Sequence, residues 1–462
     1  MTSTSPWRSM PRLAFPVLAE ESLVLMVTWT DWWLCSRYVT EHADSAKAAM
    51  GLMAYVMWLI PSLFAAVAIG ATALIARSVG GRQFALARDY ANQAIMLGWA
   101  LAVLLTAGFT IAGDSFIEAM NLQNRSAEYA KNYLWIVIPV IPLIMFEQVG
   151  SACLRGAGDT VTGFLAKLVV VIVNIAISIA LVTGWGPFPA LGWIGLAIGT
   201  AIGHSIGGTI ILTALILNRA GLRLTWRGLY PNTKLSKQLF FIGMPGGLDM
   251  GVLLGSQLIF VAMVNSLGDA AAAAHGLAVQ IEACAYLPGH AFQVAAATMV
   301  GQYLGAKQPE LARKAAWVCF LVALVIMVTA STSMFFFGDQ MSYFFTGDWD
   351  DPTTHNAASL LRIVAFGIPF LALLMVLTGA LRGAGDTAWP MMFTLVGFLA
   401  IRIPLAAFLA YATFTLPVLG WEITGLGWGV QGAWYAMVCD LLVRSCLAVA
   451  RFRQGGWQRS IL

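Results

Sequence analysis

Two carboxylates share one face of the first long apolar segment of the chain. Glu20 and Asp31 are eleven residues apart, so on a helix they project within about 20° of each other and lie about 16 Å apart along the axis. Glu21 points about 80° away from Asp31 by the same arithmetic. Ionisable side chains at membrane depth are costly and by default functional. The spacing therefore predicts a functional stripe of Glu20 and Asp31. The alternative for Glu20 is a place near the cytoplasmic interface, where a Glu is tolerated.

A second pair of acids occurs in the later part of the chain. Asp249 follows a proline by four residues, just as Glu20 does, and we expect the two at matched depth. Glu282 could approach Asp249 from a neighbouring helix, and two close carboxylates raise the affinity of one of them for a proton. Asp249 and Glu282 are therefore a candidate proton site. The alternative is that these acids pair with His275 or His290.

Glu147 and Lys167 have a structural interpretation. Each lies ten residues from Ala157, on opposite arms of a predicted helical hairpin, so the two side chains should meet at equal depth. The positions 227 residues later hold Leu374 and Thr394, so both charges are replaced together. The pattern predicts a structural ion pair, with a role in transport as the alternative.

The stretch "LRGAGDT" occurs at 154–160 and again at 381–387, and 381 − 154 = 227. Its glycines permit a tight turn, and Asp159 and Asp386 can cap the helix that follows. Arg155 and Arg382 end the helix before it, which suits the helix dipole and an ion pair with that Asp. A phosphate loop is excluded, since no strand precedes the stretch and no Gly-Lys-Ser/Thr follows it. We expect a cytoplasmic latch rather than an active site.

The composition defines the class of protein that must position these residues. Hydrophobic residues make up 59% and charged residues 10% of the 462, against roughly a quarter charged in soluble domains. The six cysteines have no metal-type spacing, and no metal site is predicted. Hydropathy predicts an all-α polytopic membrane protein with about twelve transmembrane helices. Their approximate limits are 13–37, 48–76, 90–113, 132–154, 161–183, 191–217, 238–266, 272–303, 315–337, 357–380, 390–413 and 424–450.

Lysine and arginine gather at both ends of the chain and in alternate loops, while the intervening loops are acidic. The positive-inside rule therefore predicts that both termini and both latch stretches are cytoplasmic. The net charge of +4 follows from this topology, and nothing in the sequence indicates a nucleic-acid partner.

The duplication extends beyond the latch. "GGRQFALAR" (80–88) aligns with "GAKQPELAR" (305–313). Each copy holds about six helices, so the copies enter the membrane in the same sense, as a parallel internal repeat with a cavity expected between them. We predict an N-terminal six-helix lobe over 1–218, a cytoplasmic linker over 219–237 and a C-terminal six-helix lobe over 238–462.

Several of these stretches together resemble the multidrug and toxic compound extrusion (MATE) transporters. They are both copies of "LRGAGDT", "FPVLAEESLVLMVTWTD" (15–31), "AAAAHGLAVQIEACAYLPG" (271–289) and "MVGQYLGAKQPELAR" (299–313). The resemblance covers nearly the whole chain. It implies a secondary transporter that exports amphipathic, often cationic compounds in exchange for entering H⁺ or Na⁺.

The resemblance also implies an ion-coupling site. Asp31 falls at the position of the family's main coupling carboxylate, and Asn174 and Thr200 match polar residues near the same pocket. Some members carry an Asp four residues after that Asn, where this chain has Ser178. A Na⁺ ion needs several oxygen ligands and compensating charge, whereas a proton needs one buried carboxylate. The departure favours H⁺, with Glu20 as a relay.

We therefore expect an antiporter that exports amphipathic cationic drugs or metabolites by alternating access. It is expected to be a monomer in membrane lipid, in the bacterial inner membrane, with no cofactor besides the coupling ion and no catalytic residue. One alternative is a flippase of lipid-linked or polysaccharide intermediates, which would favour a cationic cavity. The other is a membrane-embedded enzyme, but neither "HExxH" nor Gly-x-Ser-x-Gly occurs in the sequence.

Overall fold

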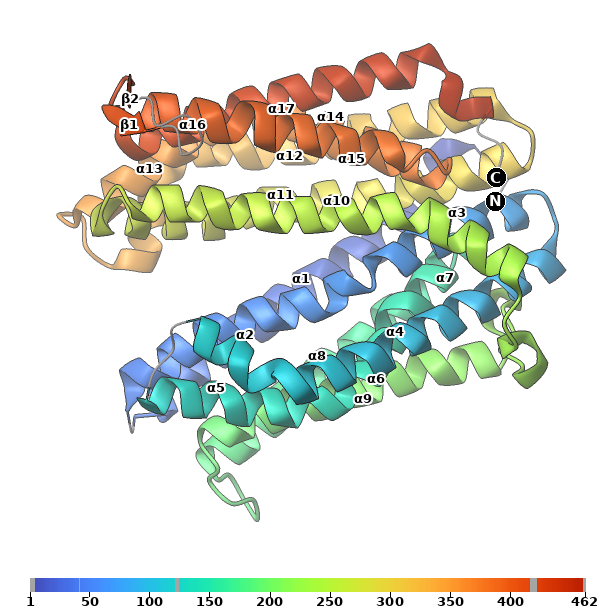
Figure 1. Cartoon of the computed structure of the whole chain (residues 1–462), viewed down its shortest axis with the longest axis horizontal. Coiled ribbons are helices and arrows are strands. Elements are labelled where there is room, and N and C mark those ends of the chain that lie inside the picture. Colours follow the sequence, from blue (N-terminus) through green and yellow to red (C-terminus); the bar gives the residue numbers. More distant parts are fainter. Residues whose placement is uncertain (1–4, 41, 121–123, 416–421, 460–462) are drawn as a thin grey trace. The chain divides into compact units, whose positions relative to one another are not determined.

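The structure is a computed structural model that describes residues 5–40, 42–120, 124–415 and 422–459. These residues form two compact units. The first comprises Pro11–Gly247, and the second comprises the chain from Leu248 onward together with the start of the first helix, up to Met10. Within each unit, long helices run side by side along one direction (Figure 1).

The first half of the chain is helical apart from short connections. Its elements are α1 (Pro6–Tyr38), α2 (Ala43–Leu63), α3 (Ala65–Gly80), α4 (Phe84–Ala119), α5 (Asn124–Val137), η1 (Ile138–Val140), α6 (Ile141–Met145), η2 (Phe146–Gly150), α7 (Ser151–Ala157), α8 (Val161–Thr183) and α9 (Trp193–Ile216). Two short helical turns, η3 (Arg219–Gly221) and η4 (Trp226–Leu229), follow before the second half.

The second half repeats the long helices and adds one small hairpin. Its elements are α10 (Thr233–Asn265), α11 (Asp269–Gly305), α12 (Pro309–Thr346), α13 (Pro352–Ala365), α14 (Ile368–Gly383), α15 (Ala388–Leu395), η5 (Val396–Arg402), α16 (Ile403–Ala410), β1 (Thr413–Thr415), β2 (Glu422–Thr424), α17 (Gly429–Gln454) and η6 (Gly456–Arg459). Strands β1 and β2 pair antiparallel.

All twelve segments predicted from hydropathy fall mainly on helices, but the last two predicted segments are too long. The segment 390–413 runs past the end of α16 into β1, and 424–450 begins in β2, before α17. Ten helices in the described residues are long and apolar enough to cross a membrane, and there are eleven if α13 and α14, bent by 54°, count as one broken span. The remaining predicted segment, 272–303, is helical as part of α11 but is not among them. Alanines and polar side chains such as His275 and Glu282 interrupt its apolar character.

The latch stretch forms the same turn in both halves. Gly158 and Gly385 have φ of 93° and 86°, a left-handed conformation that glycine adopts without a steric penalty. Each turn is closed by two backbone bonds. The amides of Gly158 and Asp159 donate to Arg155 and Leu154 (both 2.9 Å), and those of Gly385 and Asp386 donate to Arg382 and Leu381 (3.0 and 2.9 Å). This pair of backbone hydrogen bonds defines the Schellman motif at the C-terminus of a helix.

The helix before each latch packs closely on another helix because its "RGA" glycine has no side chain. A Cβ on Gly156 would lie 2.9 Å from the carbonyl oxygen of Thr72 in α3, and one on Gly383 would lie 2.0 Å from that of Ala297 in α11. The duplicated sequence therefore fixes both a turn and a helix–helix contact.

Each half contains one π-helical turn among the described residues. The first, η2, lies on the helix before the latch, and the second, η5, lies on the helix after it. Such turns insert an extra residue into a helix and are frequent at functional sites. Glu147 is on η2 and Arg402 ends η5.

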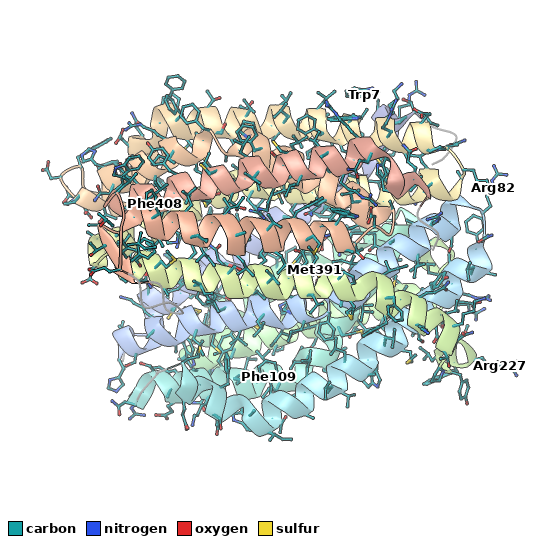
Figure 2. All side chains as sticks on the ribbon, turned by 45° about the horizontal axis from the view of Figure 1, so that its top comes forward. Trp7, Arg82, Phe109, Arg227, Met391 and Phe408 are labelled. Atoms are coloured by element: carbon teal, nitrogen blue, oxygen red, sulfur yellow. The ribbon has the colours of Figure 1, made fainter. Side chains whose placement is uncertain are left out.

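Two arginines mark one end of the helices of the first unit. Arg82 and Arg227, both in the first unit, lie at the same end of its helices, and Phe109 lies at mid-length (Figure 2). Large apolar side chains such as Ile111 and Leu104 are exposed (83% and 67%), as expected for surfaces that face lipid.

Candidate ion-coupling site

A buried polar layer joins α5, α8 and α9. The Tyr133 hydroxyl donates to Oγ1 of Thr200 (3.0 Å), and Nδ2 of Asn174 donates to the same oxygen (3.2 Å). All three side chains are buried. Thr200 accepts both bonds, so its own hydroxyl proton is left for a further acceptor.

Three oxygens in this part of the first unit are buried without a hydrogen-bond partner among the described residues. They are Oδ1 of Asp31, Oδ1 of Asn174 and Oγ of Ser178. Asp31 is 7% exposed and acts electrostatically on the Tyr133 hydroxyl. A buried acceptor without a donor is unfavourable, so the Asp31 carboxylate is suited to receiving a proton.

The approach of α9 to α8 at this layer depends on a glycine. A Cβ on Gly199 would lie 2.1 Å from Oγ of Ser178. The two helices are therefore in close contact at Ser178. The space around Ser178 fits a small side chain.

At the latch end, the arginine of each latch faces an acid on the first helix of its own half. Arg155 Nη1 lies 3.5 Å from Oε1 of Glu20 on α1, and Arg382 Nη2 forms an ion pair with Oδ2 of Asp249 on α10. Oε2 of Glu20 and Oδ1 of Asp249 are buried and have no hydrogen-bond partner among the described residues. The two acids predicted at matched depth thus have equivalent partners.

The latch aspartates are bound by other arginines. Asp159 accepts bonds from the backbone and hydroxyl of Thr162 (3.0 and 2.7 Å) and from Nε of Arg219 (2.8 Å). Burial raises the pKa of Asp159, but the bonds from Thr162 and Arg219 outweigh it and the pKa lies below its ordinary value. Asp386 accepts from Nε and Nη2 of Arg451 (2.9 and 2.7 Å).

One expectation for the second latch is therefore wrong. Arg382 pairs with Asp249 and not with Asp386 of its own loop. The side chain at the end of a helix extends back along that helix, which brings it to α10. The Asp, one residue past the turn, faces the last helix of the half.

Glu147, Lys167 and His204 meet inside the first unit. Lys167 Nζ forms an ion pair with Oε1 of Glu147, and Nδ1 of His204 lies 2.7 Å from Oε2. Both oxygens of one buried carboxylate are thus bound from α8 and α9.

The second unit has a different buried charge cluster. Oδ2 of Asp440 accepts from Arg402 (2.7 Å) and Arg444 (2.6 Å), and both guanidinium groups stack on Phe398 at 4.2 and 4.7 Å. Glu282 interacts electrostatically with Arg402.

The expected approach of Glu282 to Asp249 is not among the contacts of the described residues. Asp249 is bound by Arg382, and Glu282 lies in the field of Arg402. The alternative partner His275 accepts a bond from the Trp434 indole (3.2 Å).

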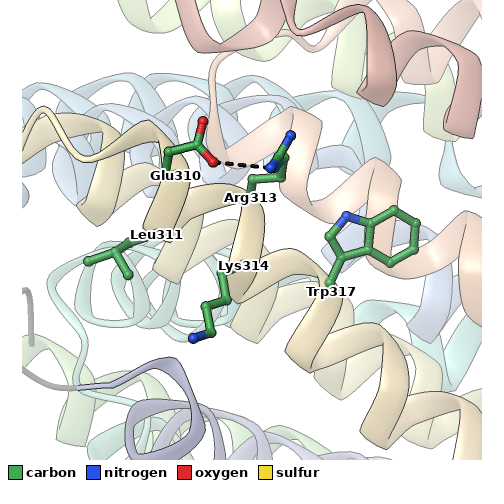
Figure 3. A pocket seen from close by; sticks show the side chains of 5 residues that line it. All are labelled: Glu310, Leu311, Arg313, Lys314 and Trp317. Carbon is green, nitrogen blue, oxygen red and sulfur yellow. Dashed lines mark ion pairs between the residues drawn. The ribbon is translucent and has the colours of Figure 1, made fainter.

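A pocket of about 410 Å³ lies apart from these acids, on the first turns of α12 (Figure 3). Glu310, Leu311, Arg313, Lys314 and Trp317 line it. The Glu310–Arg313 pair (3.1 Å) is exposed to solvent, so this depression is a charged surface feature.

Sequence reasoning missed the partners that tertiary packing supplies. Nothing in the sequence around Tyr133 indicates that its hydroxyl contacts Thr200. His204 follows Thr200 by four residues, and this spacing places both on one face of α9. Arg402 is a cation in an apolar run, which is itself a signal that it has a partner.

The chain belongs to the MatE family, whose model matches residues 16–180 and 245–408. The two matches begin 245 − 16 = 229 residues apart, so one family unit occurs twice in the chain. It is a multi-pass membrane protein of a transporter family.

Similar proteins cover nearly the full chain. A probable multidrug resistance protein NorM of Thermotoga maritima is 28% identical over 97% of this chain and 92% of its own. The uncharacterized transporter YisQ of Bacillus subtilis is 25% identical over 96% and 94%. A solved outward-facing multidrug resistance MATE family transporter matches with a TM-score of 0.89 at 21% identity, over 100% of this chain and 98% of its own. The predicted fold class, an all-α polytopic membrane protein, is confirmed.

Proposed function

We propose that the chain is a proton-coupled antiporter that exports amphipathic cationic drugs or metabolites by alternating access. One observation carries the proposal. Asp31 is a buried carboxylate with an oxygen that has no partner among the described residues. Its helix α1 is the least buried of the ten candidate spans, with 17% of its most apolar stretch buried. A carboxylate on a lightly packed helix can gain and lose a proton as the helix moves.

The choice of H⁺ over Na⁺ rests on the residue at position 178. Burying a cation without enough charge and ligands to replace its water shell is costly. Ser178 supplies a hydroxyl where a second carboxylate would serve Na⁺ better, and Gly199 holds α9 close against it. One buried acid is sufficient for a proton.

A flippase of anionic lipid-linked intermediates is less well supported. Such a transporter needs cations that are free to meet its substrate. Lys167, Arg402 and Arg444 are each bound by a carboxylate in the described structure. Lys167 is thus matched by Glu147, and Arg402 and Arg444 share Asp440, so none of the three cations lacks a counter-ion.

The test is efflux of an amphipathic cationic dye from proteoliposomes. A pH gradient and a Na⁺ gradient are imposed separately, each without membrane potential. We expect the pH gradient alone to drive transport. Transport driven by the Na⁺ gradient alone would overturn the proton assignment.

Asp31→Asn is the decisive variant. The amide keeps the shape of the side chain but cannot cycle a proton, so gradient-driven efflux should be lost while dye binding and folding remain. Asp249→Asn in the other half is the matched comparison. Efflux at the wild-type rate in Asp31→Asn would exclude Asp31 as the coupling residue.

We further propose a bacterial inner-membrane location with both termini cytoplasmic. The positive-inside rule supports it, and Arg82 and Arg227 lie at one end of the helices of the first unit. A fluorescent protein that matures only in the cytoplasm, fused to the C-terminus, should fluoresce. A dark fusion with full-length expression would reverse the orientation.

A further inference from the structure

The Glu147–Lys167–His204 cluster has no counterpart of the same kind at the repeat positions of the second half, where Leu374 and Thr394 stand 227 residues after Glu147 and Lys167. That half is helical at both places, so the repeat folds without these charges. A buried ion pair often stabilises a protein no more than apolar residues of similar volume would. A stability role alone therefore does not account for three ionisable groups at membrane depth, where such groups are by default functional.

The cluster lies on the same helix faces as the polar layer described above. Lys167 precedes Asn174 by seven residues on α8, and His204 follows Thr200 by four residues on α9. These spacings repeat a helix face, with a rise of about 10 Å and about 6 Å respectively. The charged cluster is thus one to two turns from Asn174 and Thr200, toward the latch end of both helices.

The hydrogen bonds define which nitrogen of His204 can take up a proton. Oε1 of Glu147 meets the Lys167 ammonium, as an ionised carboxylate does. An ionised carboxylate only accepts hydrogen bonds, so Nδ1 of His204 must donate to Oε2. In the neutral imidazole Nε2 then carries a lone pair. Protonation at Nε2 gives an imidazolium that keeps its bond to Glu147.

The charged and titratable groups around His204 come from several elements. Glu147 faces it from η2, and Lys167 reaches the same carboxylate from α8. Tyr133 of α5 contacts α9 one turn away, at Thr200. Glu20 and Glu21 of α1 act on Lys167, and α6 carries no ionisable residue. With His204 neutral, Glu147 and Lys167 cancel, so uptake of one proton gives the cluster a net charge of +1.

We propose that His204 is a second proton-binding residue of the N-terminal half, with Glu147 and Lys167 as the groups that position it. His204 lies between the latch end and the polar layer. It binds one proton on Nε2 and releases that proton when the imidazole becomes neutral again. This step rests on the proton antiport proposed above.

The test that does not depend on transport is a histidine titration by nuclear magnetic resonance. The full chain in detergent has five histidines, and His204→Asn identifies the His204 signal because it removes it. We expect the chemical shifts of that signal to change with pH as Nε2 takes up a proton. The midpoint should fall by about one pH unit in Glu147→Gln, which removes the carboxylate, and rise in Lys167→Gln, which leaves the carboxylate to the imidazole alone.

Shifts in opposite directions distinguish a proton site from a merely structural histidine. If Glu147→Gln fails to fold, Lys167→Gln still gives a signed result. A His204 signal that shows no titration, or a midpoint unmoved by the variants that fold, overturns the proposal.

Transport provides the second arm. His204→Asn keeps a donor for Glu147 but cannot take up a proton, so the pH profile of efflux should flatten relative to wild type. His355→Asn is the matched control, because His355 is exposed and bound to Asp339 in the other unit. If a pH gradient fails to drive wild-type efflux, the antiport proposal fails, and the titration still decides the role of His204. An unchanged pH profile in His204→Asn argues against its part in coupling.

Discussion

The two halves of the chain are alike at the latch and unlike at mid-helix. Each latch has the same Schellman turn, the same close-packed glycine and an arginine that meets an acid on the first helix of its half. The buried clusters differ. One carboxylate on η2 meets a lysine and a histidine in the first half, whereas one on α17 meets two arginines in the second. The duplicated unit has therefore kept the contacts that hold its helices and has changed the interior charges.

The two buried clusters differ in their ratio of cations to anions. With His204 neutral, the first cluster has one cation for one anion. The second has two cations for one anion, with Glu282 in the field of Arg402. The carboxylate of the second cluster therefore compensates more charge than that of the first.

The largest effect is expected for Asp440→Asn. The change leaves Arg402 and Arg444 buried without their counter-ion, and breaking a buried pair costs about 3–5 kcal/mol. Thermal unfolding in detergent should show a larger loss than for Glu147→Gln, which leaves only Lys167 unpaired. An equal or smaller loss in Asp440→Asn would mean that Glu282 takes over as the counter-ion.

The second expected effect concerns the first cluster. Glu147→Leu alone should destabilise by about 3 kcal/mol, since it leaves Lys167 buried and unpaired. Lys167→Thr alone should also destabilise, but by less, since Glu147 keeps its hydrogen bond from His204. The double variant, which copies the second half, should recover much of the loss. A double variant as unstable as the worse single variant would show that the pair does not behave as one unit.

The third effect tests the shared feature. Arg155→Ala and Arg382→Ala should both slow transport severalfold and leave the order of substrates unchanged, because the two arginines bind acids on α1 and α10. The measurement is efflux of several dyes by each variant. A selective loss for one dye would indicate that the arginine contacts substrate.

The sequence predicted the features that depend on local order along the chain. The helices follow from apolar runs, and the latch turns follow from glycines that must adopt a positive φ. Glu147 and Lys167 are brought together because equal distances along the two arms of a hairpin give equal depth. These relations need no knowledge of distant packing.

The features that the sequence could not predict depend on how each helix is rotated about its axis and on which helices pack against it. A π-helical turn has no sequence signature, and its extra residue rotates everything after it by about 100°. His204 reaches Glu147 only because α9 packs against η2 with a particular face. The partner of Arg382 depends on Asp249 of α10 coming within its reach, which the chain order does not determine.

The smallest expected effect lies at the outer end of the latches. Asp159 is held by Arg219, whose side chain is 57% exposed, whereas Asp386 is held by Arg451, which is 20% exposed and stacks on Trp389. An exposed pair contributes about 0.2–1 kcal/mol, so Arg219→Ala should cost less than Arg451→Ala in thermal unfolding at neutral pH. Because the folded-state pKa of Asp159 is lowered, its bonds stabilise the folded state above the ordinary Asp pKa, and this contribution is lost as the pH falls through the lowered value. The gap between wild type and Arg219→Ala should therefore close in acid. A gap that is constant with pH would assign the effect of Arg219 to its packing and not to its charge.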